Sequence, residues 1–300
     1  MFAEVVQLIA SGLVVGSLYA LLGVSWAVIY GVTGTFHFAH GLTFTLAGYA
    51  AILLRVGLRL PLVAAASGAA LAGAFFGCAI ERLVYRPIRR ESRGQLSIFL
   101  ASMGIMVLGE ALLQIAFTPT PRSFPDFHDR IFTAGPVTLT LADVCLGVTA
   151  WTSIALLELF LALTRTGREI RAVRSNPEMA TIVGIDFNRV FLVVFALGSA
   201  LMGLGAFFVT VQSAATPQMG LTFVLMAFIA TFLGGVASPW TVALAGVGIG
   251  LVENLSLLYV SAQYKHVVVF AAMFVFLLFR PQGFLGKSGM SSLRLLKKGA

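Results

Sequence analysis

The feature that most constrains this chain is a series of nine apolar runs, which together occupy most of its 300 residues. A helix needs about 20 apolar residues to cross the roughly 30 Å hydrocarbon core of a bilayer, and most of the runs have about that length. Because 59% of the residues are hydrophobic and only 11% are charged, the composition excludes a water-soluble globule. We therefore predict an all-α, polytopic transmembrane helical bundle of eight to nine spans that forms one domain over residues 1–300. The runs lie at about 5–30, 38–55, 61–84, 95–117, 140–163, 190–211, 220–237, 240–259 and 266–280.

Basic residues gather in three clusters beside these runs, and their distribution predicts the orientation of the chain. Cytoplasmic loops of membrane proteins are rich in Lys and Arg. Alternating the runs across the bilayer places all three clusters on one side and the loop at 118–139 on the other, so we expect a cytoplasmic C-terminus. The net charge of +8 then encodes topology and does not indicate a nucleic-acid groove. The clusters are Arg82, Arg86, Arg89, Arg90 and Arg93; Arg165, Arg168, Arg171, Arg174 and Arg189; and Arg280, Lys287, Arg294, Lys297 and Lys298.

Two stretches, at 30–41 and 232–240, interrupt the apolar pattern with glycine and polar residues. Non-helical backbone at membrane depth must be buried in protein or line a wet cavity, so we predict broken or re-entrant helices at these two places, with a pathway through the protein as one candidate for such a cavity. The sequence GLTF occurs at 41–44 and again at 220–223, at the start of two runs that should cross in opposite directions, and this predicts an inverted repeat. The candidate pathway residues are Phe36, His37, His40, Gly41, Gly220, Gly234, Gly235 and Ser238.

Titratable residues inside apolar runs are candidates for function by default. Glu110 and Glu253 lie deep in their runs, and we interpret both as structural groups that join helices, with a role in transport as the alternative. Glu158 is nearer the cytoplasmic end of its run. His37 and His40 would share one face of a helix, but no third metal ligand lies near them in the sequence. We therefore predict hydrogen bonding at a helix break and no metal site.

The longest polar segment, residues 164–190, should lie in water and contact a partner. Ser175 or Asn176 suits a helix N-cap, Pro177 suits the first helical position, and Gly184 suits a left-handed residue after the last turn. The helix of about two turns that results carries apolar residues at i, i+3 and i+4, and a helix so short needs a partner surface. An ordinary membrane-surface loop is the alternative. The predicted docking residues are Arg171, Arg174, Asn176, Pro177, Glu178, Met179, Ala180, Ile182, Val183 and Gly184.

Several sequence segments resemble one family of membrane proteins. The run GREIRAVRSNPEMATIVGIDFNRV resembles the cytoplasmic coupling segment in permease subunits of bacterial ABC importers for branched-chain amino acids. GSLYALLGVSWAVIYGVTGTFHFAHG is similar to the N-terminal part of the H-type subunit of that family, and LGGVASPW, LVENLSLLY and RPQGFLGK are similar to its C-terminal third. The pairs Phe36-His37 and Pro239-Trp240 depart from the residues common in the family and leave the substrate open.

The resemblance implies a bacterial inner-membrane permease subunit that moves branched-chain or other hydrophobic amino acids inward by alternating access. It also implies a second related permease, a periplasmic binding protein and two cytoplasmic ATPase subunits that bind the ATP and Mg. This chain itself is expected to be no enzyme and to hold no cofactor. Gly286, Lys287 and Ser288 look like the end of a phosphate-binding loop, but the glycine that the motif needs five residues before Gly286 is absent. Related permeases also handle urea, short amides or aromatic acids. A stand-alone secondary carrier or channel is the alternative from another class.

Overall fold

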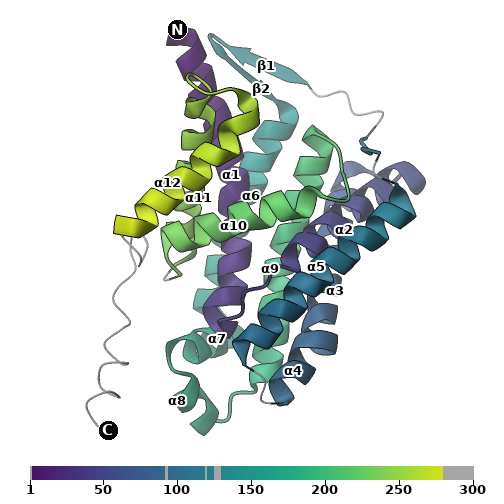
Figure 1. Cartoon of the computed structure of the whole chain (residues 1–300), viewed down its shortest axis with the longest axis vertical. Coiled ribbons are helices and arrows are strands. Elements are labelled where there is room, and N and C mark those ends of the chain that lie inside the picture. Colours follow the sequence, from purple (N-terminus) through teal and green to yellow (C-terminus); the bar gives the residue numbers. More distant parts are fainter. Residues whose placement is uncertain (1, 92–93, 119, 125–129, 237, 280–300) are drawn as a thin grey trace.

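The protein is an all-α bundle in the computed structural model, which describes residues 2–279 except 92–93, 119, 125–129 and 237 (Figure 1). A small β-hairpin covers one end of the bundle. The helices are α1 (Phe2–Thr33), α2 (His40–Ile52), α3 (Leu62–Ile80), α4 (Arg86–Arg90), α5 (Gln95–Phe117), α6 (Leu141–Leu163), α7 (Arg165–Ser175), α8 (Pro177–Ile182), α9 (Phe187–Gln212), α10 (Met219–Gly234), α11 (Pro239–Ser256) and α12 (Lys265–Phe279). Short π-helical turns follow α2 (Leu53–Gly57) and α3 (Glu81–Tyr85), a 3-10 turn (Ala262–Tyr264) precedes α12, and the strands are β1 (Ile131–Ala134) and β2 (Val137–Thr140).

The apolar runs all became helices, but the predicted count of eight to nine spans is not confirmed. Within the described residues, five helical segments are long and apolar enough to cross a membrane: 2–33, 62–90, 95–117, 141–163 and 187–212. The pair α10 and α11 would make a sixth, although the chain turns by 119° between them. The other apolar helices, α2 and α12, have 13 and 15 described residues, which is less than a full crossing requires. The protein is thus a polytopic helical bundle with several partial spans.

The helices form two sets that run in opposite directions. In Figure 1, α1 descends from the N-terminus whereas α9 ascends from α8, and α3 descends towards α4 whereas α11 ascends. Since α2 leads from the end of α1 to the start of α3, and α10 leads from the end of α9 to the start of α11, the two GLTF helices also run in opposite senses. This is the arrangement that an inverted repeat requires.

Small residues let the helices of the two sets approach closely in equivalent ways. A Cβ added to Gly16 of α1 would lie 2.7 Å from the Cα of Val247 in α11. In the other set, Gly73 and Gly77 of α3 are packed against the backbone or side chain of Ser199 in α9. The packing of α11 on α1 therefore repeats the packing of α3 on α9.

The hairpin β1–β2 lies in the loop that the sequence predicted as one external segment, and its strands were not predicted. Ile131 pairs with Thr140 and Ala134 with Val137 in an antiparallel register. The Gln7 side chain of α1 fastens β2: its amide nitrogen donates to the Thr138 carbonyl at 3.0 Å, and its oxygen accepts from the Thr138 amide at 2.7 Å. The third basic cluster, in residues 280–300, lies outside the described part of the chain.

Candidate translocation and coupling site

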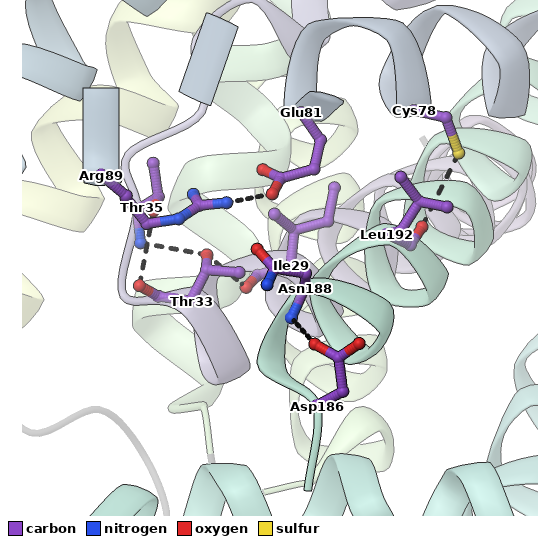
Figure 2. A network of polar contacts seen from close by, with 9 residues as sticks. All are labelled: Ile29, Thr33, Thr35, Cys78, Glu81, Arg89, Asp186, Asn188 and Leu192. Atoms are coloured by element: carbon purple, nitrogen blue, oxygen red, sulfur yellow. Dashed lines mark hydrogen bonds and ion pairs between the residues drawn. The ribbon is translucent and has the colours of Figure 1, made fainter. Parts of the chain in front are cut away.

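The first helix break comprises residues 34–39, between α1 and α2. The Thr33 hydroxyl donates to the Ile29 carbonyl at 2.8 Å and accepts from the Thr35 amide at 3.2 Å (Figure 2). Gly34 has a φ of +64°, which is outside the helical region and so ends α1, and glycine adopts this conformation readily because it has no Cβ. Helix α2 begins at His40, whose amide donates to the carbonyl of His37 at 3.2 Å. Local hydrogen bonds therefore hold the break in one shape.

Both predicted histidines are buried at this break and make hydrogen bonds. Nδ1 of His37 lies 2.8 Å from the Tyr85 hydroxyl, and Nε2 of His40 lies 3.1 Å from the Ser25 hydroxyl. The two imidazole rings are 5.0 Å apart, centre to centre. Among the described residues no group of three or more His, Cys, Asp or Glu side chains could hold a metal ion. The histidines thus join α1, α2 and the turn after α3.

A buried ion pair that the sequence analysis missed lies beside this break. Glu81 is 1% exposed and pairs with Arg89 of α4 (Figure 2). The Arg89 guanidinium also lies 4.7 Å from the ring centre of Phe191, near the start of α9. Glu81 lies at the end of its apolar run, where an acidic side chain can ordinarily reach the membrane–water interface. Its position in the run therefore does not indicate that it is buried.

The second predicted break, at Gly234, Gly235 and Ser238, separates α10 from α11. Gly235 has a φ of +74°, and the Ser238 hydroxyl caps α11 by accepting from the Trp240 amide at 3.3 Å. The repeat places the true counterpart of the first break elsewhere, at residues 213–218 between α9 and α10. That break was missed, although the polar run Gln212–Gln218 could have indicated it.

The two deep acids differ in their surroundings. Glu253 of α11 is fully buried, accepts from the Tyr19 hydroxyl at 2.6 Å and lies 2.8 Å from Nζ of Lys265 at the start of α12. Glu110 of α5 is half-buried, and within the described residues its one hydrogen bond is accepted from the Gln114 amide, at 3.4 Å. Glu253 therefore joins three helices, whereas Glu110 joins none.

The predicted docking helix is α8, at the end of the bundle opposite the hairpin (Figure 1). Asn176 is its N-cap, with the side-chain oxygen accepting from the Met179 amide at 3.0 Å, and Pro177 is its first residue. Gly184 has a φ of +78° just after the helix, as its end requires. Ala180 is buried against the bundle, and Glu178 is exposed. The apolar stripe points away from the bundle: Met179, Ile182 and Val183 are 55%, 76% and 69% exposed.

Arg174 connects this segment to the membrane part. Its side chain is half-buried and its Nε lies 3.6 Å from the position of a Cβ on Gly31, where Val236 also approaches. Burial lowers the pKa of the Arg174 guanidinium, and the nearby carboxylate of Glu158 opposes that shift. Arg171 is exposed and donates to a carbonyl at the end of α6. Arg174 thus reaches the end of α1 and the break at 235–238 together.

Comparison with known proteins gives consistent relatives. A family model described as "Branched-chain amino acid transport system / permease component" matches residues 8–278. The high-affinity branched-chain amino acid transport system permease protein LivH of Escherichia coli is 28% identical over 95% of this chain and 97% of its own. The corresponding BraD of Pseudomonas aeruginosa is 29% identical over 94% of this chain and 95% of its own. Among solved structures, PsaBC from Streptococcus pneumoniae in complex with Fab matches 99% of this chain and all of its own with a TM-score of 0.53 and 11% identity, a likeness of fold.

Proposed function

Because the chain belongs to the branched-chain amino acid transport system permease family, we propose that it is the membrane-spanning subunit of an ATP-driven importer of branched-chain or similar hydrophobic amino acids. It would act with a second, related permease, a periplasmic binding protein and two cytoplasmic ATPase subunits, which would bind the ATP and Mg. The names of the relatives LivH and BraD, each similar along nearly the whole chain, support the substrate class. The C-terminus would then lie in the cytoplasm.

The observation that carries the ATPase coupling is the exposed apolar stripe of α8. Met179 and Ile182 of this six-residue helix, with Val183 directly after it, would not be left in water without a surface to cover them. A groove on an ATPase subunit fits a stripe of this length. The cap at Asn176 and the left-handed Gly184 fix both ends of α8, so the helix can be pushed as a rigid body.

Two sets of contacts support transmission of such a push to the helix breaks. Arg174 connects the segment to Gly31 and Val236, beside the second break. On the other side, α9 starts five residues after α8 and presents Phe191 to Arg89, which pairs with the buried Glu81. Energetic coupling needs a contiguous set of packed groups with two arrangements. We propose that ATP binding moves α8 and thereby alternates access from the outer to the inner side.

Reconstitution in liposomes tests this proposal. The purified chain, with its partner permease, both ATPases and the loaded binding protein, is expected to accumulate L-leucine only when ATP is supplied on the ATPase side. The permease subunits alone are expected to be inert under an imposed solute or proton gradient. Gradient-driven uptake by this chain without ATPases would contradict the proposal and establish a secondary carrier or channel instead.

A further inference from the structure

We propose that a half-exposed aromatic surface at the first helix break binds the apolar side chain of the transported amino acid. The inference rests on the proposed function and adds the site at which substrate size is sensed. The aromatic surface consists of Tyr30, Phe36, Phe38, Phe99, Phe228 and Phe232, each half-buried.

The rings come from both repeats and from α5, and they contact one another across the break. Phe36 stacks on Phe232 of α10 with parallel planes and a centre distance of 6.1 Å. Tyr30 of α1 lies 5.2 Å from Phe36 and 5.4 Å from Phe232. Phe99 of α5 meets Phe38 edge-to-face at 5.7 Å. The aromatic surface therefore spans the junction of the two repeats, where transporters built from inverted repeats bind their substrates.

The break holds this surface in place. The Ser102 hydroxyl of α5 donates to the Phe36 carbonyl at 3.0 Å and accepts from the Phe38 amide at 3.3 Å. The residues between and before these two, Thr35 and His37, are buried, whereas Phe36 and Phe38 are only half-buried. This alternation leaves the two phenylalanine residues on the more exposed side of the break and the other two on its buried side.

Unpaired donors lie next to the rings. Trp26 is 1% exposed, stacks on Tyr30 at 4.9 Å, and its indole nitrogen has no hydrogen-bond partner. Within the described residues, the backbone amides of Phe36 and His37 also have no acceptor. Of these three donors, the Trp26 nitrogen is buried, and a buried donor without an acceptor costs about 1 to 3 kcal/mol. A carboxylate would supply the missing acceptor.

Aromatic faces beside free donors match one class of ligand, a zwitterionic amino acid with an apolar side chain. A purely apolar partner, such as a lipid chain or the flat side of a transmembrane helix, would leave the donors unpaired. The aromatic surface and the donors therefore favour the substrate over a neighbouring subunit as the occupant.

Size-selective variants test the site in the reconstituted transporter. Phe36→Trp and Phe232→Trp each enlarge a ring of the surface and are expected to lower uptake of L-leucine relative to the smaller L-valine by about tenfold, since one methylene decides discrimination of that order in an apolar pocket. Trp26→Phe, which keeps a ring but removes the donor, is expected to lower uptake of both substrates alike. The matched control is Phe75→Trp, an exposed aromatic residue of α3 whose one aromatic partner among the described residues is Phe76. An unchanged leucine-to-valine ratio in both Phe variants would overturn the inference.

Thiol labelling distinguishes occupants without relying on transport rates. In a background with Cys78 and Cys145 replaced by Ser, Phe36→Cys is expected to react with a membrane-permeant maleimide, and leucine-loaded binding protein with ATP should slow the reaction whereas unloaded binding protein should not. Complete protection of the thiol without leucine would indicate that the second permease covers the surface, and equal labelling in all conditions would indicate no occupant. Either result overturns the site. A wild-type transporter that fails to take up leucine with ATP would instead refute the proposed function.

Discussion

Gly41 and Gly220 meet where α2 and α10 cross, and each is the first residue of a GLTF sequence. A Cβ on Gly41 would lie 2.7 Å from the Gly220 carbonyl oxygen, so neither position has room for a side chain. Three residues further along each copy, Phe44 and Phe223 stack with ring centres 4.7 Å apart. Contacts between equivalent residues place the pseudo-two-fold axis of the repeat between these two helices.

Gly220→Ala is expected to destabilise the protein because the added methyl would collide with the backbone of α2. Overpacking a tight helix crossing costs about 1 to 3 kcal/mol, which thermal unfolding of the purified permease in detergent can measure. The matched control is Gly248→Ala in α11, where an added Cβ meets nothing within 4 Å. Equal thermal stability of the two variants would contradict the close crossing.

Met179→Asp is expected to abolish ATPase stimulation by loaded binding protein and to weaken co-purification of the ATPases. The change places an unpaired charge on the stripe that should be covered by the partner, and buried unpaired charges are costly. Glu178→Gln, at the neighbouring exposed position, is the control and should cost only a few tenths of a kcal/mol through the helix dipole. If Met179→Asp kept the ATPases bound and uptake normal, α8 would be an ordinary interfacial helix.

Gly184→Val is expected to impair coupling as Met179→Asp does, because a β-branched residue is strained at a φ of +78°. Gly184→Asn provides a sharp comparison, since asparagine tolerates the left-handed region far better. ATP-driven uptake should follow the order Gly, Asn, Val. An Asn variant as defective as the Val variant would point to a steric requirement at the ATPase surface instead of a backbone one.

Glu253→Gln is expected to lower thermal stability by about 2 kcal/mol or more, because it leaves Lys265 facing a buried neutral group. Glu110→Gln should change stability by only a few tenths of a kcal/mol, since Glu110 is half-exposed and weakly bonded. The sequence pattern alone predicts the same structural role for both acids. A Glu253→Gln protein of wild-type stability with altered substrate preference would assign this acid to transport.

Opposite accessibility is expected for the hairpin and for α8. In cells expressing a variant without Cys78 and Cys145, a membrane-impermeant maleimide should label Thr133→Cys on β1 but should label Glu178→Cys only after lysis. Both positions are exposed, so a difference in labelling reports the side of the membrane and not the burial of the thiol. The reverse pattern would invert the predicted orientation.

The helices could be predicted from the sequence because a helix surrounded by lipid or by other helices consists of one unbroken run of apolar residues. Helix α5 occupies the same residues as its apolar run, 95–117, and α9 extends its run by only a few residues. The number of crossings could not be predicted, since hydropathy gives the length of a segment and says nothing of its direction. Hydropathy likewise gives no sign of the 119° turn between α10 and α11.

The candidate site was predictable where its signals are local. Asn176, Pro177 and Gly184 determine the start and end of α8 through their own backbone preferences. The burial of Glu81 depends on Arg89 and on helices far away in the sequence, and no local pattern encodes it. The polar run Gln212–Gln218 is a local sign of the break at 213–218, but its equivalence to the break at 34–39 follows only from the order of the helices in the two repeats.

The two hydrogen bonds between Gln7 and Thr138 tie the hairpin to the end of α1, so the hairpin is expected to move with that helix. At 32 residues, α1 is about 48 Å long. Because α11 is packed closely against it at Gly16, we expect the two helices to tilt together. One end of α1 is joined to the hairpin through Gln7, and the other end adjoins Arg174. A rotation of about 5° around the centre of a rod of that length displaces each end by about 2 Å in opposite senses. We therefore expect a small tilt about the middle of α1 to move the hairpin and the Arg174 side chain in opposite directions.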